Sequence, residues 1–191
     1  FLFVYGIGLS LLSWQLARKV KLQNRELRRL SRMDPLVELA NRGFLIHRTE
    51  RVLESIRQSG DSACLLMLDV DDFKRINDSF GHRTGDEVLR RIAGVLGQLA
   101  RPKDTPARLG GDEFAVLLDQ CTVDEAMQLA GQVRKKLREA GPIESVDMRF
   151  SVSIGIAAAP DKGGPEDWLA IADEALYQAK RQGKDTASYA Y

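Results

Sequence analysis

The chain has 191 residues but only two cysteines and two histidines. Cys64 stands inside an apolar run and Cys121 just before a helical pattern, so a disulfide framework is not expected and a reducing cytosol fits. His47 and His82 are too few for a histidine-rich metal site. The sequence therefore excludes a disulfide scaffold and a metal centre built mainly from histidine.

The chain also lacks the common mononucleotide-binding loop. No segment reads Gly-x-x-x-x-Gly-Lys-Ser/Thr, the motif whose backbone N–H groups cradle phosphates in many nucleotide-binding proteins. If this protein binds phosphates, it must hold them with a metal ion and with lysines that are scattered along the chain.

An excess of basic charge is absent over most of the chain. Lys and Arg number 28 and Asp and Glu 27, but residues 18–32 alone carry seven basic side chains and one acidic one, which leaves a net charge of −5 for the rest. Nucleic-acid binding through a broad basic face is therefore poorly supported.

Charged side chains are missing altogether from residues 1–17, which are mostly apolar or small. About seventeen residues is the short limit for spanning a bilayer, so we expect a truncated transmembrane helix here. The basic residues 18–33 would then form a linker or stalk helix on the cytoplasmic side, and an apolar stripe in it fits dimerisation. A buried or partner-binding helix at 1–17 and a solvated linker at 18–33 are the alternatives.

The most informative feature that is present is the segment 108–114, which reads Arg-Leu-Gly-Gly-Asp-Glu-Phe. The apolar run 114–118 follows at once, so the segment predicts the tip of a hairpin that enters a buried strand. The two glycines allow positive φ and the close approach of a ligand. Asp112 and Glu113 place two carboxylates at the turn, and oxygen ligands on a rigid tip suit Mg²⁺, which usually brings phosphates with it. An ordinary Gly-Gly hairpin with solvated acids is the alternative.

A second acidic centre follows the apolar run 63–68, which has the length of a buried strand. Asp69 ends this run, and a carboxylate at the carboxyl end of a buried strand is a usual ligand position. Asp69, Asp71 and Asp72 would repel one another without a counter-charge, so a divalent cation is a natural partner. Alternatively, Asp71 or Asp72 caps the helix that follows. We predict that Asp69 and Asp112 meet across one shared cation.

Four motifs in order resemble the GGDEF domain, the diguanylate cyclase family that condenses two GTP into cyclic di-GMP. They are the opening motif 34–42, the nucleotide-binding stretch 69–86, the signature 110–114 and the closing helix motif 177–180. The resemblance implies an α/β (α+β) fold: a central mixed, largely antiparallel sheet wrapped by helices, similar to nucleotidyl cyclase and polymerase palm domains, with an N-terminal helix before it. We assign residues 34–191 to this domain.

The resemblance also implies the metal-binding and catalytic residues. Two Mg²⁺ ions (or Mn²⁺) per active half-site would be held by Asp69, the carbonyl of Val70, Asp112 and Glu113, of which the three acids are the catalytic residues. The ions would bridge the triphosphate for in-line attack by a 3′-hydroxyl. Because two GTP molecules face each other from two subunits in this reaction, the resemblance implies a homodimer.

Other positions match the family's contacts to GTP. Asn77 and Asp86 match the pair that reads guanine, through an amide that donates and a carboxylate that accepts. The phosphate contacts fall on the backbone N–H groups of Asp72 and Phe73, on Lys74, Lys180 and Lys184, and on Gly110 and Gly111, which leave room for the nucleotide. At Lys184 the family more often has arginine, so a bidentate donor is replaced by a point charge.

Residues 101–104 match the family's product-inhibition site. There Arg101 would bind phosphate and stack on guanine, while Asp104 accepts from the guanine edge. Family sites also recruit an arginine from a later helix, and Arg134 and Arg138 are both candidates. Without the resemblance, this segment would be a solvated turn after a helix that Pro102 ends.

The chain departs from the family pattern at Val37 and Glu38, where Thr-Gly is usual and where the incoming helix joins the domain. Because the active-site residues are retained, the sequence favours a diguanylate cyclase over a catalytically silent cyclic di-GMP receptor, and a cyclase that also accepts ATP is a third hypothesis. Together with the segment 1–17, the resemblance places the protein in the inner (cytoplasmic) membrane of a bacterium, with the catalytic domain in the cytoplasm.

Hydrophobic periodicity locates further elements. Apolar residues recur at helical spacing over 88–99, 123–137 and 168–179. They alternate over 148–156 as in a strand with one buried face. The glycine-rich stretch 160–165 is expected to be a loop.

Overall fold

The sheet is built around strand β2 (Cys64–Val70), which is buried along almost its whole length. In the computed structural model, which describes residues 32–143 and 148–190, β2 pairs antiparallel with two strands that come later in the chain. They are β4 (Glu113–Leu118) and β5 (Val152–Ala158). The strand predicted from the apolar run 63–68 therefore lies at the centre of the sheet, as expected for residues buried on both faces.

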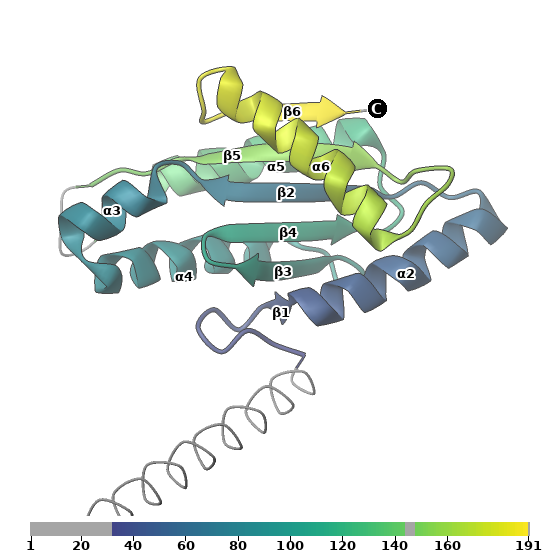
Figure 1. Cartoon of the computed structure of the whole chain (residues 1–191), viewed down its shortest axis with the longest axis horizontal. Helices are drawn as coiled ribbons and strands as arrows, with labels where there is room; N and C mark the ends of the chain where they lie inside the picture. The colour runs from purple at the N-terminus through teal and green to yellow at the C-terminus, as the bar shows by residue number, and fades with distance from the viewer. Residues whose placement is uncertain (1–31, 144–147, 191) are drawn as a thin grey trace, which may run out of the picture. The chain divides into compact units, whose positions relative to one another are not determined.

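The remaining strands extend the sheet on both sides (Figure 1). Strand β3 (Thr105–Gly110) joins β4 antiparallel, and β1 (Ala40–Asn41) adds parallel to β3. On the other side, β6 (Ala187–Ala190) adds parallel to β5. The order β1-β3-β4-β2-β5-β6 has antiparallel pairs in the middle and parallel pairs at the edges. The predicted mixed, largely antiparallel sheet is confirmed.

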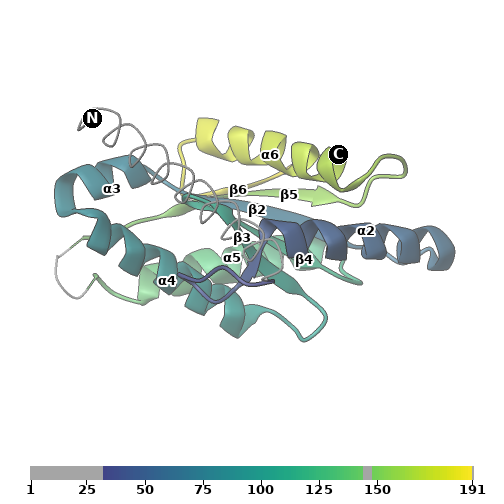
Figure 2. The ribbon, with the colours of Figure 1, turned by 60° about the horizontal axis from the view of Figure 1, so that its bottom comes forward.

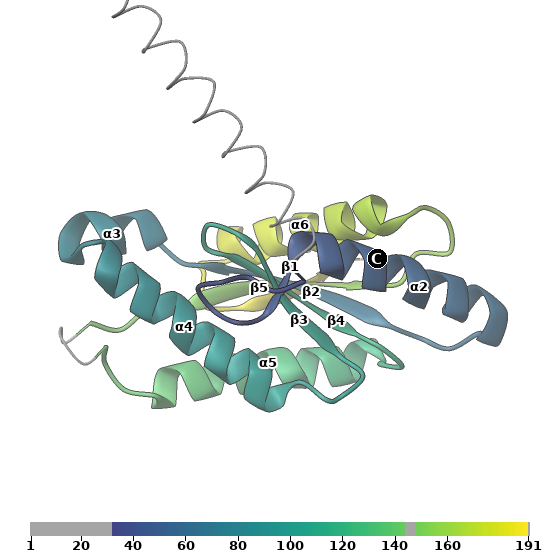
Figure 3. The ribbon, with the colours of Figure 1, turned by 90° about the horizontal axis from the view of Figure 1, so that it is seen from below.

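Helices cover both faces of this sheet (Figure 3). Helices α2 (Arg42–Ser59) and α6 (Pro165–Arg181) pack on one face. Helices α4 (His82–Leu99) and α5 (Val123–Glu139) pack on the other. The short helix α3 (Phe73–Phe80) follows β2 directly and packs against α4, and Figure 2 shows it at the same end of the sheet as the start of α4.

Alternation along β2 explains why there are two cores. Leu66 and Leu68 belong to the core under α4 and α5, whereas Leu65 and Met67 belong to the core under α2 and α6. Successive side chains of a strand point to opposite faces, and each buried leucine contributes roughly 1.5–3 kcal/mol relative to an exposed one. By the same alternation, Asp69 faces α6.

The predicted helical patterns 88–99, 123–137 and 168–179 lie within α4, α5 and α6 and are confirmed. The strand predicted to start at Met148 begins only at Val152. Met148 and Phe150 instead pack against the core without joining the sheet. Alternating apolar residues report burial on one side, and burial does not require strand pairing.

Helix α2 has no counterpart among the elements predicted from the sequence. Its buried face includes Thr49, whose hydroxyl donates to the carbonyl of Leu45 at 2.9 Å, so a polar residue interrupts the apolar stripe. Both ends of α2 carry capping residues. The side chain of Asn41 accepts from the backbone N–H of Phe44 at 3.0 Å, and Gly60 ends the helix with a φ of 75°.

The predicted location in the cytoplasmic membrane needs correction. Among residues 32–143 and 148–190, no helix is long and apolar enough to cross a membrane. The predicted span 1–17 and most of the predicted linker 18–33 lie outside the residues that the structure describes. A run without charges is necessary for a span but does not by itself form one, so the membrane location is withdrawn.

Candidate active site

Asp69 stands near the end of β2, where the strand leaves the sheet. It lies directly opposite Glu113 of β4 and Ser153 of β5 in the strand registers. Residues that are directly opposite on neighbouring strands share a face, so Asp69 and Glu113 project to the side of the sheet that α6 covers. From α6, the ammonium of Lys180 lies 2.8 Å from the Asp69 carboxylate, whose side chain is 14% exposed.

Several charges meet at Asp69. Burial raises the pKa of its carboxyl group above the usual range, the hydrogen bond and charge of Lys180 lower it, and the charges of Asp112 and Glu113 raise it further. The three acids are therefore close enough to repel one another. The pKa of Asp69 remains raised in spite of Lys180. An additional cation at this place would therefore compensate the negative charge of the three acids, which Lys180 alone does not neutralise.

The predicted hairpin is formed by β3 and β4, and its turn lies at the same end of the sheet as the start of α3 (Figure 1). Gly110 has a φ of 150° and Gly111 a φ of 53°, so the predicted positive φ values are confirmed. Arg108 fixes the tip, because its guanidinium donates twice to the carbonyl of Gly111, at 3.1 and 2.6 Å. The same guanidinium also pairs with Asp34. Sequence reasoning missed this role of Arg108, although it stands at the start of the signature.

The three acids offer a metal ion carboxylate oxygens as ligands. Within the described part of the chain, no group of three or more His, Cys, Asp or Glu is arranged to hold one. Mg²⁺, however, is commonly bound through one or two carboxylates and completed by water and substrate phosphates. Asp69, with Asp112 and Glu113 beside it and the buried Val70 next in the chain, fits a cation that is shared with a phosphate ligand.

Asp72 stands in the turn between β2 and α3, and Phe73 and Lys74 are the first two residues of α3. Asp72 precedes α3 in a left-handed conformation with a φ of 56° and makes no side-chain capping bond, so the alternative prediction of a capping aspartate is wrong for Asp72. Its carboxylate accepts from Lys184 at 2.7 Å. This hydrogen bond lowers the pKa of Asp72 and raises that of Lys184. Phe73 packs against the core and Lys74 is exposed on the first turn of α3.

Asn77 of α3 and Asp86 of α4 come from two helices that pack together. The amide oxygen of Asn77 is buried and has no hydrogen-bond partner among the described residues. It rests on Gly85, where a Cβ atom would lie 2.1 Å from that oxygen. Asp86 is half-exposed and lies 3.9 Å from Arg90. Gly85 therefore leaves the space that the Asn77 amide occupies against α4, a role that sequence reasoning missed.

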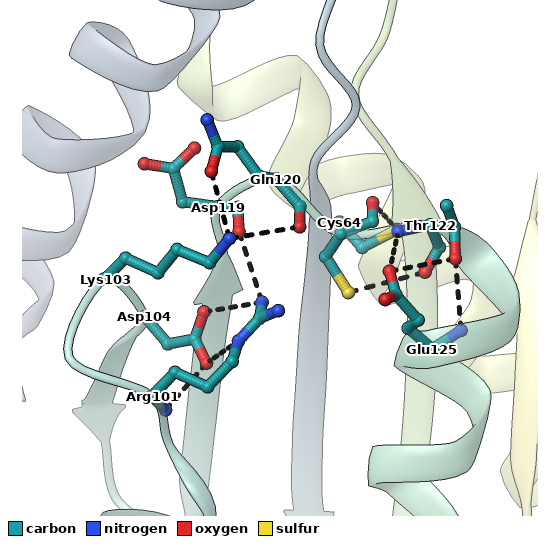
Figure 4. A network of polar contacts seen from close by, with 9 residues as sticks. Cys64, Arg101, Lys103, Asp104, Asp119, Gln120, Thr122 and Glu125 are labelled. Carbon is teal, nitrogen blue, oxygen red and sulfur yellow. Dashed lines mark hydrogen bonds and ion pairs between the residues drawn. The ribbon is translucent and has the colours of Figure 1, made fainter.

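The predicted inhibitory residues form a tight pair (Figure 4). Arg101 donates to both oxygens of Asp104 at 2.9 Å and to the carbonyl of Asp119 at 3.2 Å. The Asp104 side chain is 1% exposed and that of Arg101 39%. The hydrogen bond to Asp104 raises the pKa of Arg101. Figure 4 also shows Lys103 of the same turn reaching toward Gln120 instead.

A cavity of about 200 Å³ opens beside this pair. From α5 it is lined by Glu125, Gln128, Leu129 and Gln132. The candidate arginines Arg134 and Arg138 do not line it, because both bind Asp185 instead. Helix geometry explains this placement, since residues 132 and 134 point to different sides of one helix.

Both cysteines lie near this cavity. Cys121 lines it, and the thiol of Cys64 donates to the carbonyl of Cys121. Both are buried and free, as the prediction of no disulfide requires. Burial raises the pKa of Cys64 to about 12 and also raises that of Cys121, so burial disfavours the reactive thiolate form of both.

A family model described as "Diguanylate cyclase, GGDEF domain" matches residues 31–186. Among curated proteins, the bifunctional diguanylate cyclase/cyclic di-GMP phosphodiesterase MucR of Pseudomonas aeruginosa is 38% identical over 177 residues, covering 92% of this chain and 25% of MucR. Diguanylate cyclase DosC of Escherichia coli is 37% identical over 155 residues, covering 80% of this chain and 34% of DosC. The chain thus spans about a quarter to a third of the length of these relatives.

The chain is also similar to solved structures of GGDEF domains. The coiled coil and GGDEF domain of DgcB from Caulobacter crescentus, in complex with c-di-GMP, superposes with a TM-score of 0.80 at 29% identity, covering 93% of this chain and 95% of that one. The GGDEF domain of YfiN (TpbB) from Pseudomonas aeruginosa superposes with a TM-score of 0.76 at 36% identity, covering 81% and 98%.

Proposed function

The chain belongs to the diguanylate cyclase GGDEF domain family, and from this premise we propose that it condenses two molecules of GTP into cyclic di-GMP with release of two pyrophosphates. The observation that carries the proposal is the placement of Asp69 opposite Glu113, with Asp112 close enough to raise the pKa of Asp69. The segment 34–191 would be the catalytic domain, preceded by the basic linker 18–33.

Asp69, the carbonyl of Val70, Asp112 and Glu113 would hold two Mg²⁺ ions per active half-site, with Mn²⁺ as a substitute. When bound, such ions neutralise the charge of the triphosphate and polarise the α-phosphorus. The contribution of the chain is to present these oxygens from a strand end and a hairpin tip, both of which are fixed by sheet hydrogen bonds and by Arg108. A rigid donor set loses little free energy to reorganisation during the reaction.

The triphosphate would lie across the β2–α3 turn. The backbone N–H groups of Asp72 and Phe73 would face it, since helix starts favour anions. Lys180 and Lys184 already lie at this turn, paired with Asp69 and Asp72, and would exchange those partners for phosphate oxygens. The exposed Lys74 would add a third cation, while Gly110 and Gly111 would leave the hairpin tip open to the nucleotide.

Guanine would be read between α3 and α4. The Asp86 carboxylate can accept from guanine N1–H and from the exocyclic amine. The Asn77 amide, held by its contact with Gly85, would face the other edge of the base. This pairing would favour GTP over ATP, because adenine offers no N1–H donor and carries its amine at a different position.

The reaction needs two domains. In each step the 3′-oxygen of one GTP forms a bond to the α-phosphorus of the other, the bond between the α-phosphorus and the bridging oxygen breaks, and pyrophosphate leaves while the 3′-hydroxyl proton is lost. Each domain holds one nucleotide, so the enzyme would act as a homodimer with two half-sites facing each other.

Cyclic di-GMP would inhibit it by binding at Arg101 and Asp104, beside the cavity of about 200 Å³.

The test is a product assay on the 191-residue chain with GTP and Mg²⁺. Asp112→Ala should remove most cyclic di-GMP synthesis, whereas Asp173→Ala, at an exposed acid on α6, should leave it unchanged. Unchanged synthesis in Asp112→Ala would refute the assignment. A parent chain that binds cyclic di-GMP but makes none would instead be a silent receptor. A mixture of GTP and ATP would reveal a cyclase that also accepts ATP through a hybrid product.

A further inference from the structure

Asp71 is a buried acid that the proposed reaction does not use. Only 7% of the residue is exposed, although it stands in a turn next to the nucleotide-binding residues. Burying a carboxylate is costly unless its oxygens are hydrogen-bonded. The bonds that Asp71 makes therefore indicate what it does.

Three donors satisfy the Asp71 carboxylate. The hydroxyl of Ser153 donates to one oxygen at 2.7 Å. The hydroxyl of Ser151 and the backbone N–H of Asp185 donate to the other, at 2.6 and 3.0 Å. None of these bonds caps α3, so the alternative prediction of a capping Asp71 is wrong. The carboxylate instead joins the β2–α3 turn to the start of β5 and to the turn after α6.

The two turns that Asp71 joins are both in an uncommon backbone conformation. Asp72 has a φ of 56°, Lys184 of 64° and Asp185 of 41°. Residues other than glycine adopt these values at a cost and keep them only where the surrounding contacts demand it. The bond from Asp185 to Asp71 is one such contact, and it connects the two turns directly.

Asp185 is also held from its other side. Arg134 of α5 pairs with its carboxylate at 3.1 Å and donates to its backbone carbonyl as well. Arg138 pairs with the same carboxylate at 3.2 Å. The turn after α6 is thus fixed between α5 and Asp71, and the result is that Lys184 reaches the β2–α3 turn, 2.7 Å from Asp72.

We propose that Asp71 is a positioning residue for the triphosphate: it holds the turn that carries Lys184 against the β2–α3 turn, so that the ammonium of Lys184 faces the phosphates. This inference rests on the proposed function. Asp71 does not contact the nucleotide itself and acts through Lys184. Aspartate suits three converging donors, because an amide would lack the charge and would present its own NH₂ to one of them, which only a serine hydroxyl could accept.

The first measurement is the affinity of the 191-residue chain for a GTP analogue with a methylene group between the α- and β-phosphorus atoms. Asp71→Asn should weaken binding about tenfold, the order expected for one lost charge-assisted hydrogen bond. The KM for GTP should rise by a similar factor while kcat changes little. Trp168→Phe is the matched control, because it removes another buried hydrogen bond, from the indole to the carbonyl of Ala157, without touching either turn. It should lower the melting temperature and leave the affinity unchanged.

A double-mutant cycle tests whether Asp71 acts through Lys184. If it does, Asp71→Asn combined with Lys184→Ala should bind the analogue no more weakly than Lys184→Ala alone. The proposal would be overturned if the losses of affinity from the two single substitutions multiplied fully in the double variant. An unchanged affinity in Asp71→Asn would also overturn it. An equal loss of affinity in Trp168→Phe would also overturn it, because general loosening would then explain the effect.

Amide hydrogen exchange separates this inference from the proposed function. In Asp71→Ala the N–H of Asp185 loses its acceptor and should exchange faster, whereas in Trp168→Phe it should not. A parent chain that turns over no GTP would refute the proposed function, yet the exchange rate would still decide whether Asp71 holds the turn. Unchanged exchange at Asp185 would refute that role even in an active enzyme.

Discussion

The guanidinium of Arg108 lies 3.2 Å from the carboxylate of Asp34, in a pair whose side chains are only 12% and 20% exposed. Asp34 also accepts from the backbone N–H groups of Leu36 and Val37, while Arg108 holds the carbonyl of Gly111. The start of the domain and the tip of the signature hairpin are therefore fixed to each other. A disturbance at the entry to the domain has a direct route to Asp112.

Asp34→Asn should loosen this connection. Removing one partner of a partly buried charged pair costs about 1–3 kcal/mol, so we expect a clearly lower melting temperature and a several-fold lower rate of cyclic di-GMP synthesis. The matched control is Glu166→Gln, which removes an equally short but exposed pair with Arg42 and should change neither quantity by much. Equal effects of the two substitutions would contradict the role given to Asp34.

Glu38→Gly should stabilise the domain. Glu38 has a φ of 57°, which costs a residue with a Cβ atom about 1 kcal/mol or more, and the family usually has glycine here. We expect the melting temperature to rise by about 2–4 °C, measured by thermal unfolding. Glu38→Ala keeps the Cβ atom and removes only the carboxylate, so it should give no such gain. A rise in the alanine variant would assign the effect to charge instead of backbone strain.

Gly85→Ala should weaken the binding of GTP. A Cβ atom at this position would lie 2.1 Å from the amide oxygen of Asn77, so the amide must leave its place against α4. We expect a rise in KM for GTP of about tenfold, as for one lost hydrogen bond to the base, and unchanged binding of cyclic di-GMP at Arg101. Gly94→Ala on the same helix has no atom within 4 Å of its new Cβ and should behave as the parent.

Asp69→Asn should make the nucleotide-free domain more stable at neutral pH while removing its activity. The pKa of Asp69 is raised, chiefly by burial, so the native state binds its proton more readily than the unfolded state does. The stability that this group contributes is present below the unfolded pKa, near the ordinary value of 3.8, and is lost as the pH rises through the folded pKa. The gain in the asparagine variant should therefore be largest near pH 7 and shrink toward pH 4.

For Asp72→Asn we expect the opposite dependence of the free energy of unfolding on pH. The pKa of Asp72 is lowered by Lys184, so its contribution is present above the unfolded pKa and is lost as the pH falls through the folded pKa. The asparagine variant should show no gain at neutral pH. Urea unfolding of both variants between pH 4 and 7 measures the difference, and a gain in both would refute the assignment of the Asp69 effect to burial.

Arg101→Ala should abolish inhibition by cyclic di-GMP and also destabilise the domain. It leaves the buried carboxylate of Asp104 without its charged partner, which costs about 1–3 kcal/mol. Lys103→Ala is the control within the same turn, because the ammonium of Lys103 donates to Gln120 and not to Asp104. Initial rates with and without added cyclic di-GMP distinguish the two variants. Persisting inhibition in Arg101→Ala would show that the product acts elsewhere.

The sequence by itself determined the elements whose signals are local. The apolar run before Asp69 became β2 because a stretch buried on both faces has few other solutions. The glycine pair became a turn with positive φ because only glycine adopts such values readily. The motif spacing placed Asp69 and Asp112 in one family pattern. The alternating residues from Met148 predicted a strand start that is wrong, because alternation indicates burial on one side and not strand pairing.

Only the tertiary structure decided which side chains meet. Lys180 pairs with Asp69 because α6 covers the face of the sheet to which Asp69 points. The order and register of the strands decide which face that is. The hydrogen-bond donors to Asp71 stand 80 to 114 positions later in the chain. Arg134 pairs with Asp185 and does not line the cavity beside Arg101. Such contacts depend on how whole elements pack, and no local pattern encodes that packing.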